Sequence, residues 1–170
     1  MAVLIGFGLR HAGLLVFAAS VLALATAFVA QYGFGLYPCV LCIYQRWPYV
    51  VTGLLGLAAA AFVRRQGWRV ALLALAGVGF AVGGGIAAFH VGVEQLWWEG
   101  TAACAGPTDT ADSIEAMRAQ LLARPAAACD EVPWDLFGIS IAGWNVLASA
   151  LFAAASLYAA SALARGRTAA

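Results

Sequence analysis

The sequence has no lysine and few charges of either sign: 10% of its 170 residues are charged, and 64% are hydrophobic. A soluble globular domain has about 25% charged residues, so an ordinary soluble domain is excluded. Nine arginines face eight acidic residues, for a net charge of +1. Because there is no excess of basic residues, we expect no nucleic-acid partner. The composition indicates a membrane protein whose main partner is the lipid bilayer.

Four long runs contain almost no charge, over about residues 12–30, 43–63, 70–93 and 137–163. Each has roughly 19 residues or more and can cross a hydrocarbon core of about 30 Å as a helix. The alternating pattern of a membrane β-barrel is absent. The sequence therefore predicts an all-α, four-transmembrane-helix bundle that forms a single integral membrane domain over residues 1–170.

The first run has a second interpretation. Arg10, the apolar stretch and the triplet ATA at residues 25–27 also resemble a secretory signal peptide. We favour a membrane helix, because the run exceeds the usual apolar region of a signal peptide, which is about 7–15 residues long. Cleavage there would leave the topology of the later helices unchanged.

The uneven distribution of charge predicts the orientation. Arginines lie before the first run, between the second and third, and after the fourth: Arg10; Arg64, Arg65 and Arg69; Arg165 and Arg167. The positive-inside rule places these segments, and both termini, in the cytoplasm. All the acidic residues lie between positions 94 and 135, where two arginines leave a net charge of −6. The loops over about residues 31–42 and 94–136 are therefore expected outside.

The longer loop contains an amphipathic segment, TDTADSIEAMRAQLLARP, over residues 108–125. It has capping residues at its start, apolar residues on one side and a proline at its end. We expect a short helix that lies on the membrane surface.

All four cysteines fall on the extracytoplasmic side in this topology, where disulfides form and persist. Cys39 and Cys42 lie at the mouth of the second helix, and Cys104 and Cys129 lie in the long loop. Four cysteines allow three pairings. Cys39 and Cys42 can bridge locally, which would leave Cys104 with Cys129. We expect no metal, because a zinc site of four thiolates favours two close Cys-x-x-Cys pairs and only one is present.

The position of the Cys-x-x-Cys pair favours a redox role over a structural one. Unpaired N–H groups and the helix dipole at a helix N-terminus lower the pKa of a thiol. At about 100° per residue, Cys39, Cys42 and Arg46 fall on one helical face. An arginine at this depth is costly unless it is functional or reaches the interface. On the third helix, His90 and Glu94 share a face near the outer surface, as interfacial residues or as proton partners for a bound molecule.

Two disulfides can pass an electron pair between them by thiol–disulfide exchange. In this topology one pair faces soluble proteins and the other faces the bilayer. An acceptor beyond the second pair must take two electrons and live in lipid, and quinone meets both demands.

These features together resemble the bacterial disulfide bond formation protein B family, DsbB, over essentially the whole chain. The resemblance is carried by PCVLCIYQR at the second helix, HVGVE on the third, the lone Cys104, and CDEVPWDLFGISIAGWN from Cys129 onward. It implies a multi-pass protein of the bacterial inner membrane with its redox loops in the periplasm. It also implies an enzyme, a protein-disulfide:quinone oxidoreductase.

In that family's scheme, a reduced DsbA-like thioredoxin-fold protein of the periplasm attacks the Cys104–Cys129 disulfide, and Cys104 forms the mixed disulfide. Electrons then pass to Cys39 and Cys42 and on to the membrane quinone pool, ubiquinone or menaquinone.

The resemblance also implies a quinone site. Cys42 would be the thiolate that engages the ring, with Arg46 beside it and His90 nearby. We add Glu94 because it shares a helical face with His90.

Two rival interpretations exist. Enzymes of the vitamin K epoxide reductase type are also four-helix, quinone-coupled thiol oxidases, but their loop cysteines precede the Cys-x-x-Cys pair, whereas here Cys39 and Cys42 come first. A structural tetraspan protein with two inert disulfides would bind no quinone.

Overall fold

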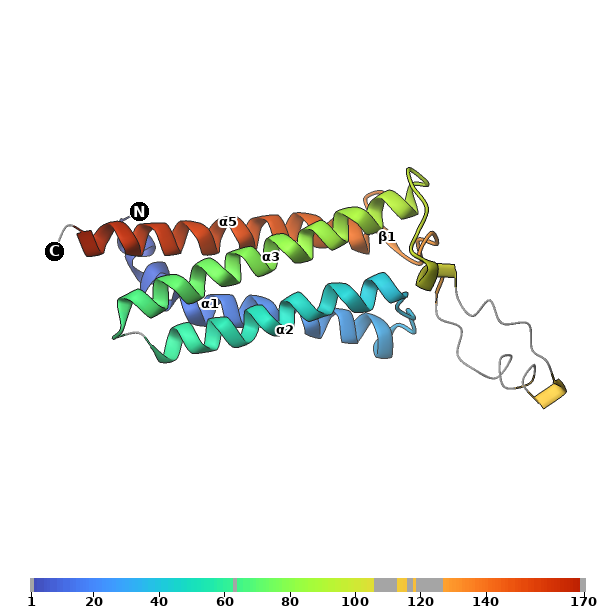
Figure 1. Cartoon of the computed structure of the whole chain (residues 1–170), viewed down its shortest axis with the longest axis horizontal. Coiled ribbons are helices and arrows are strands. Elements are labelled where there is room, and N and C mark those ends of the chain that lie inside the picture. The colour runs from blue at the N-terminus through green and yellow to red at the C-terminus, as the bar shows by residue number, and fades with distance from the viewer. Residues whose placement is uncertain (1, 63, 106–112, 116–117, 119–126, 169–170) are drawn as a thin grey trace.

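The computed structural model describes the chain except for residues 1, 63, 106–112, 116–117, 119–126 and 169–170. Its main elements are four long helices: α1 (Ala2–Phe28), α2 (Val40–Ala61), α3 (Gln66–Glu94) and α5 (Ile141–Thr168). They lie side by side along one long axis (Figure 1). The smaller elements are a π-helical turn η1 (Val29–Gly33), a 3-10 turn η2 (Ala102–Ala105), and an antiparallel hairpin of β1 (Asp135–Leu136) and β2 (Ile139–Ser140). The predicted helical membrane architecture is confirmed.

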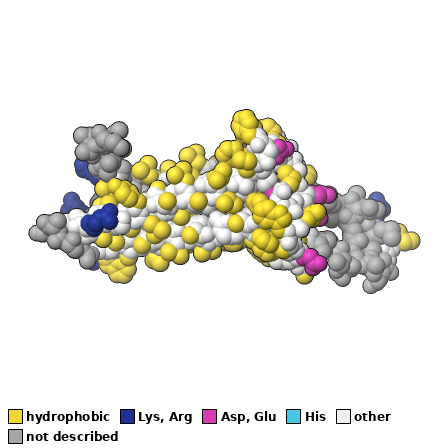
Figure 2. All heavy atoms as spheres, turned by 90° about the horizontal axis from the view of Figure 1, so that it is seen from above, with side chains coloured by type: hydrophobic (Ala, Val, Ile, Leu, Met, Phe, Trp, Pro, Cys, Tyr) yellow, Lys and Arg dark blue, Asp and Glu magenta, His cyan; other side chains and the backbone are white. Residues whose placement is uncertain are grey.

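Three helical segments among the described residues are long and apolar enough to cross a membrane: Leu9–Gly33, Gln66–Glu94 and Ile141–Gly166. Hydrophobic side chains cover the middle of the molecule on the face in Figure 2. This is the surface of a protein that lies in lipid. α2 packs against both α1 and α3, but it carries Gln45 and Arg46 among its apolar residues. That α2 also crosses the membrane stays a prediction.

The start of α5 differs from the predicted start at residue 137, because α5 begins at Ile141. Phe137 and Gly138 have φ angles of 55° and 76°, a left-handed conformation that turns the β1–β2 hairpin and interrupts a right-handed helix. The helix begins after the hairpin, where Ser140 Oγ accepts a hydrogen bond from the Gly143 N–H at 3.1 Å. Most of the predicted surface helix over residues 108–125 lies outside the described residues.

Glycines determine how closely the helices approach. A Cβ on Gly13 would lie 2.7 Å from the carbonyl oxygen of Gly56, and a Cβ on Gly56 would lie 2.7 Å from the backbone nitrogen of Phe17. A Cβ on Gly79 of α3 would lie 2.7 Å from a methyl group of Thr52 in α2. These close approaches of small residues are typical of packing between membrane helices. They make α1 an integral part of the bundle.

The two ends of the bundle differ in charge. Both termini lie at one end (Figure 1), and arginines gather there (Figure 2). Arg69 is buried at this end and donates hydrogen bonds to the backbone carbonyls of Leu9 and Arg10. The sequence predicts this arginine only as a topology signal, but its contacts also fasten α3 to α1. Glu94 lies at the opposite end, where it lines a small cavity together with Cys39 and Cys42.

Candidate functional site

All four cysteines meet in one small cluster at the acidic end of the bundle. Cys39 and Cys129 are 2% and 1% exposed, and Cys42 and Cys104 pack against them. Cys104 and Cys129 form a disulfide. Cys39 and Cys42 are free thiols whose Sγ atoms lie 3.1 Å apart. The structure therefore places one disulfide and one dithiol next to each other, with Leu41 and other apolar side chains around them.

Cys39 is the N-cap residue of α2, outside the helix itself. Its backbone is extended, and its Sγ accepts a hydrogen bond from the Cys42 N–H at 3.2 Å. This is the standard position for a side chain that stabilises a helix start, and it favours a negatively charged sulfur. The hydrogen bond with the Cys42 thiol is the main cause of a lowered pKa for the Cys39 thiol; the contact with His90 lowers it further, and burial opposes both. In the reduced pair the thiolate is therefore favoured on Cys39, whereas the family resemblance places it on Cys42.

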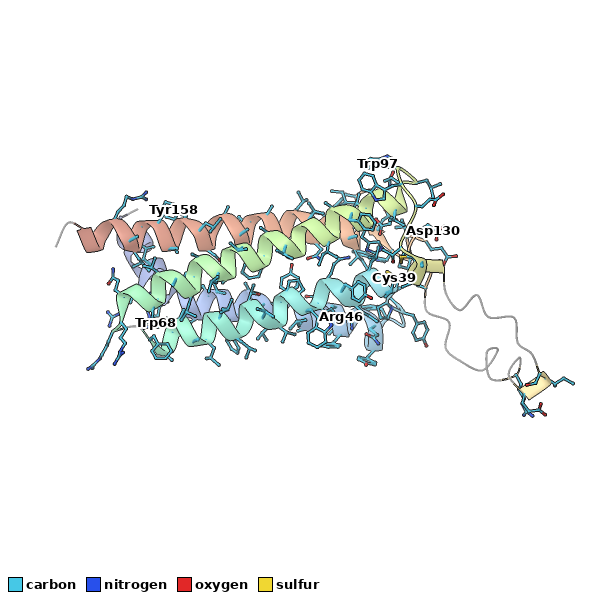
Figure 3. The ribbon with its side chains drawn as sticks, in the orientation of Figure 1. Cys39, Arg46, Trp68, Trp97, Asp130 and Tyr158 are labelled. Carbon is cyan, nitrogen blue, oxygen red and sulfur yellow. A yellow bond between two sulfur atoms is a disulfide. The ribbon has the colours of Figure 1, made fainter. Side chains whose placement is uncertain are left out.

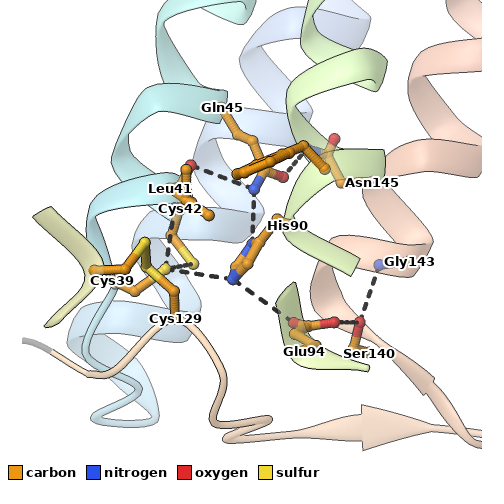
Figure 4. Close-up of polar contacts among 12 residues, drawn as sticks. Cys39, Leu41, Cys42, Gln45, His90, Glu94, Cys129, Ser140, Gly143 and Asn145 are labelled. Atoms are coloured by element: carbon orange, nitrogen blue, oxygen red, sulfur yellow. Dashed lines mark hydrogen bonds and ion pairs between the residues drawn. A yellow bond between two sulfur atoms is a disulfide. The ribbon is translucent and has the colours of Figure 1, made fainter. Parts of the chain in front are cut away.

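His90 connects this dithiol to Glu94. Its Nε2 lies 3.5 Å from Cys39 Sγ and 3.8 Å from Glu94 Oε1 (Figure 4). The Ser140 hydroxyl donates to the other carboxylate oxygen of Glu94 at 2.5 Å, so the hairpin before α5 holds this carboxylate in place. The structure thus brings together Cys39, Cys42, His90 and Glu94, four of the residues that the sequence singles out.

The structure places Arg46 in a different set of contacts. Its Nη1 donates to Gln31 Oε1 at 2.7 Å, and its guanidinium lies 5.1 Å from the centre of the Phe28 ring. Arg46 lies on α2 one turn beyond Cys42, further from the bundle mouth than Cys39 (Figure 3). The described contacts of the guanidinium are therefore with α1 and η1, whereas His90 lies on α3.

Sequence reasoning missed a buried chain of polar side chains. Gln45 Nε2 donates to His90 Nδ1 at 2.9 Å, and Gln45 Oε1 accepts from Asn145 Nδ2 at 2.5 Å. Asn145 Oδ1 accepts from the Tyr49 hydroxyl at 2.5 Å, and that hydroxyl lies 3.0 Å from Ser149 Oγ. A readable signal exists, since Gln45 and Tyr49, like Asn145 and Ser149, are polar pairs four residues apart within otherwise apolar helices.

A cavity of about 30 Å³ adjoins the dithiol and is lined by Cys39, Cys42, His90 and Glu94, among others. It has room for a water molecule or a small ion and is too small for the aromatic ring of a quinone. A quinone ring would have to approach the dithiol from the surface of the bundle. A larger apolar cavity of about 440 Å³ lies among α1, α3 and α5. None of the predicted site residues lines it.

Two sulfurs and a ring nitrogen at the bundle mouth could hold a metal by distance alone. The Sγ atoms of Cys39 and Cys42 and a nitrogen of His90 lie within 4.8 Å of one another. Thiolate and imidazole are ligands that zinc prefers. Coordination through Nε2 would need a free lone pair on that nitrogen, and the hydrogen bonds of the imidazole decide whether one exists.

Comparisons with known proteins identify the family of the chain. The family model named Disulfide bond formation protein DsbB matches residues 9–159, a range that contains all four cysteines. The chain belongs to the DsbB family. Disulfide bond formation protein B of Xanthomonas campestris pv. campestris strain 8004 is 34% identical over 146 residues, 83% of this chain and 84% of that protein. The protein of the same name from Saccharophagus degradans is 32% identical over 144 residues, 82% and 85% of the two chains.

A third relative, disulfide bond formation protein B of Pasteurella multocida, is 32% identical over 147 residues, 84% of this chain and 80% of that protein. No solved structure matches significantly. Membership in the DsbB family identifies the chain as a membrane-embedded thiol–disulfide oxidoreductase of disulfide bond formation.

Proposed function

We propose that this DsbB-family protein reoxidises a DsbA-like periplasmic dithiol oxidase and passes the electron pair to membrane quinone. One observation carries the proposal: a disulfide and a dithiol lie in one cluster at the mouth of an apolar helical bundle. Two sulfur couples in contact can exchange electrons by attack of thiolate on disulfide. The bundle in turn brings one of these couples to the edge of the lipid.

Differences in burial support the order of the steps. Cys129 is buried and Cys104 is half-buried, so an incoming thiolate reaches Cys104 first and forms the mixed disulfide there, while Cys129 leaves as a thiolate. The donor's second thiol then attacks the mixed disulfide, which releases the donor as a disulfide and leaves Cys104 and Cys129 reduced. Exchange with a Cys39–Cys42 disulfide re-forms the Cys104–Cys129 bond and yields the Cys39–Cys42 dithiol.

The dithiol needs an acceptor of high potential. DsbA-type donors are known to be poised near about −120 mV, so transfer to glutathione, at roughly −200 mV, would be uphill by about 80 mV, or ~4 kcal/mol for two electrons. When bound, quinone supplies an acceptor of two electrons and two protons within the lipid.

The residues around Cys42 fit such a molecule. Ile43, Tyr44 and Trp47 are exposed on α2, which offers an apolar surface at the edge of the bundle. The Arg46 guanidinium supplies fixed positive charge nearby, where a reduced ring carries negative charge. Beside the thiols, His90 can donate or accept a proton.

Charge and topology support the orientation. The arginine-rich end with both termini would face the cytoplasm, and the cysteine cluster would face the periplasm. A reporter fused after Ala170 should then be active only in the cytoplasm. Periplasmic activity of the reporter would overturn this orientation.

Mixing the purified protein with a reduced DsbA-like protein and a short-chain quinone tests the function. We expect loss of donor thiols that requires both the enzyme and the quinone. A rate that is the same with and without quinone would favour the structural interpretation. Mass spectrometry of a quinone extracted with the protein would identify the natural acceptor.

A further inference from the structure

His90 is held from both sides of its ring. Its Nε2 faces the sulfur of Cys39 at 3.5 Å, and its Nδ1 faces the side-chain amide of Gln45 at 2.9 Å. A neutral imidazole carries one proton, and the hydrogen bond at one nitrogen decides which nitrogen holds it. The amide of Gln45 therefore controls what His90 presents to Cys39.

The orientation of the Gln45 amide is fixed by a group that can only accept. The Gln45 Nε2 lies 3.3 Å from the backbone carbonyl of Leu41, so the NH₂ group points there and toward His90. On the other side, Asn145 Nδ2 donates to Gln45 Oε1 at 2.5 Å (Figure 4). Since Gln45 donates to Nδ1, this nitrogen carries no proton, and the proton lies on Nε2, which faces the Cys39 sulfur at 3.5 Å and Glu94 Oε1 at 3.8 Å.

Asn145, on another helix, fixes the orientation of the Gln45 amide. It lies on α5, and its amide spans the gap between Gln45 and the Tyr49 hydroxyl. If Gln45 turned its amide over, its NH₂ would face the NH₂ of Asn145, and its oxygen would face the carbonyl of Leu41. Both contacts would be repulsive, and buried polar groups left without partners are costly.

We propose that Asn145 is a positioning residue that acts through Gln45 to hold His90 in the Nε2–H tautomer, so that His90 donates to the sulfur of Cys39. The ring then stabilises the Cys39 thiolate in the reduced enzyme. The same tautomer leaves Nε2 without a lone pair for a metal, although two sulfurs and the ring lie within 4.8 Å. The inference deepens the proposed function, and only its activity readout depends on that function.

A purely structural role is the competing explanation, because filled hydrogen bonds also stabilise a bundle. The two explanations differ in what they predict for the imidazole. A structural role predicts that the loss of Asn145 changes stability and leaves the tautomer as it was. A positioning role predicts that the tautomer changes even where the bundle remains folded.

The chain has two histidines, His11 and His90, so a His11→Gln background labelled with ¹⁵N-histidine reports on His90 alone. Long-range proton–nitrogen correlations distinguish the two neutral tautomers. We expect the reduced protein to show the Nε2–H form. Asn145→Leu removes the donor to Gln45 at similar side-chain size, and we expect it to populate both tautomers.

Gln45→Glu provides a second variant that does not depend on how well Asn145→Leu folds. A carboxylate beside Nδ1 accepts a hydrogen bond, so it requires a proton on that nitrogen. We expect the Nδ1 signal to change from the unprotonated to the protonated type. Ser20→Ala is the matched control, because Ser20 is a buried polar residue whose hydroxyl contacts Thr52 at 2.9 Å, away from His90. This control should leave the His90 signals unchanged.

Activity then separates positioning from binding. We expect Asn145→Leu to lower kcat about tenfold, by analogy with the residues that orient metal-bound histidines, whose loss costs roughly 10–100-fold in activity. The kcat/KM for the DsbA-like donor should not change, because the donor reacts at Cys104 before the slowed step. A single Nε2–H tautomer in both Asn145→Leu and Gln45→Glu, or an Nδ1–H form in the parent, would overturn the inference. Since the tautomer is read without donor or quinone, this result stands apart from failure of the proposed function.

Discussion

The two cysteine pairs of this protein are built in different ways. Cys39 and Cys42 lie within one helical turn, where the helix backbone and His90 surround the Cys39 sulfur. Cys104 and Cys129 are 25 residues apart in sequence and join two loop segments. The surroundings of the first pair stabilise a thiolate at Cys39. The second pair has one half-buried sulfur, Cys104, that a partner protein can reach. The comparison indicates that the two pairs have different roles: the Cys39–Cys42 pair stabilises a thiolate, and the Cys104–Cys129 pair is accessible to a partner.

Of the substitutions considered, Cys104→Ser should have the largest effect on turnover with the donor protein, because it removes the accessible sulfur of the second pair. Without the accessible sulfur, the donor has no disulfide to attack, so turnover should fall below about a thousandth of the wild-type rate, as for the loss of a nucleophile. Stopped-flow measurement of donor thiol loss gives the rate. Cys129→Ser is the matched control, because it keeps Cys104 and should trap a stable mixed disulfide with the oxidised donor. Turnover that survives Cys104→Ser would contradict the relay.

The lowered pKa of the Cys39 thiol predicts that the stability of the protein with a reduced Cys39–Cys42 pair depends on pH. An ordinary thiol has a pKa of about 8.5. The folded state favours the thiolate of Cys39 over the thiol. This preference stabilises the folded, reduced protein fully above about pH 8.5, and the stabilisation is lost as the pH falls through the folded pKa of Cys39. In a Cys104→Ser/Cys129→Ser variant, thiolate absorbance should have its midpoint below about pH 8.5.

His90→Gln in that variant should move the midpoint upward, because it removes the ring nitrogen 3.5 Å from the sulfur. His11→Gln is the control, since His11 lies toward the opposite end of the bundle, and it should leave the midpoint in place. A parent midpoint at or above the ordinary thiol value would show that the helix start and His90 do not stabilise a thiolate.

Arg46→Ala should have a smaller effect that is confined to one substrate. Its guanidinium lies at the α1–α2 face, away from the Cys104–Cys129 disulfide. We expect the apparent KM for quinone to rise about tenfold, the worth of one charge-assisted contact, with the KM for the donor unchanged. Arg46→Lys should give an intermediate value, because it keeps the charge and loses the planar contact with Phe28. Equal changes in both constants would count against a role at the quinone.

Much of this site can be predicted from the sequence. Charge-poor runs predict the membrane helices, and the four-residue spacing of His90 and Glu94 predicts that these two share a helical face. These features depend on local backbone geometry, which sequence spacing reports directly. That His90 lies near the Cys-x-x-Cys pair was implied only by the family resemblance.

Contacts between helices could not be predicted in the same way. The sequence does not say which face of α5 meets α2, so the bond between Gln45 and Asn145, 100 positions apart, is visible only in the fold. For the same reason the contact of Arg46 with Gln31, which the π-helical turn carries, was not predicted. The start of α5 was predicted too early, because the left-handed turn at Phe137 has no strong signal in an apolar run.

Tyr49→Phe should have the smallest effect and tests how far the control of charge extends from the sulfurs. The change removes a hydroxyl that donates to Asn145 Oδ1 and keeps the ring that packs on Phe80. Asn145 Oδ1 retains the Ser149 hydroxyl at 3.3 Å, and its NH₂ still donates to Gln45. We therefore expect a loss of about 1 kcal/mol in the free energy of unfolding, measured in detergent with a denaturant, and an unchanged midpoint for the thiolate. A midpoint shift as large as that of His90→Gln would mean that Tyr49, at the end of the polar chain farthest from the cysteines, controls the charge on Cys39 as strongly as the imidazole does.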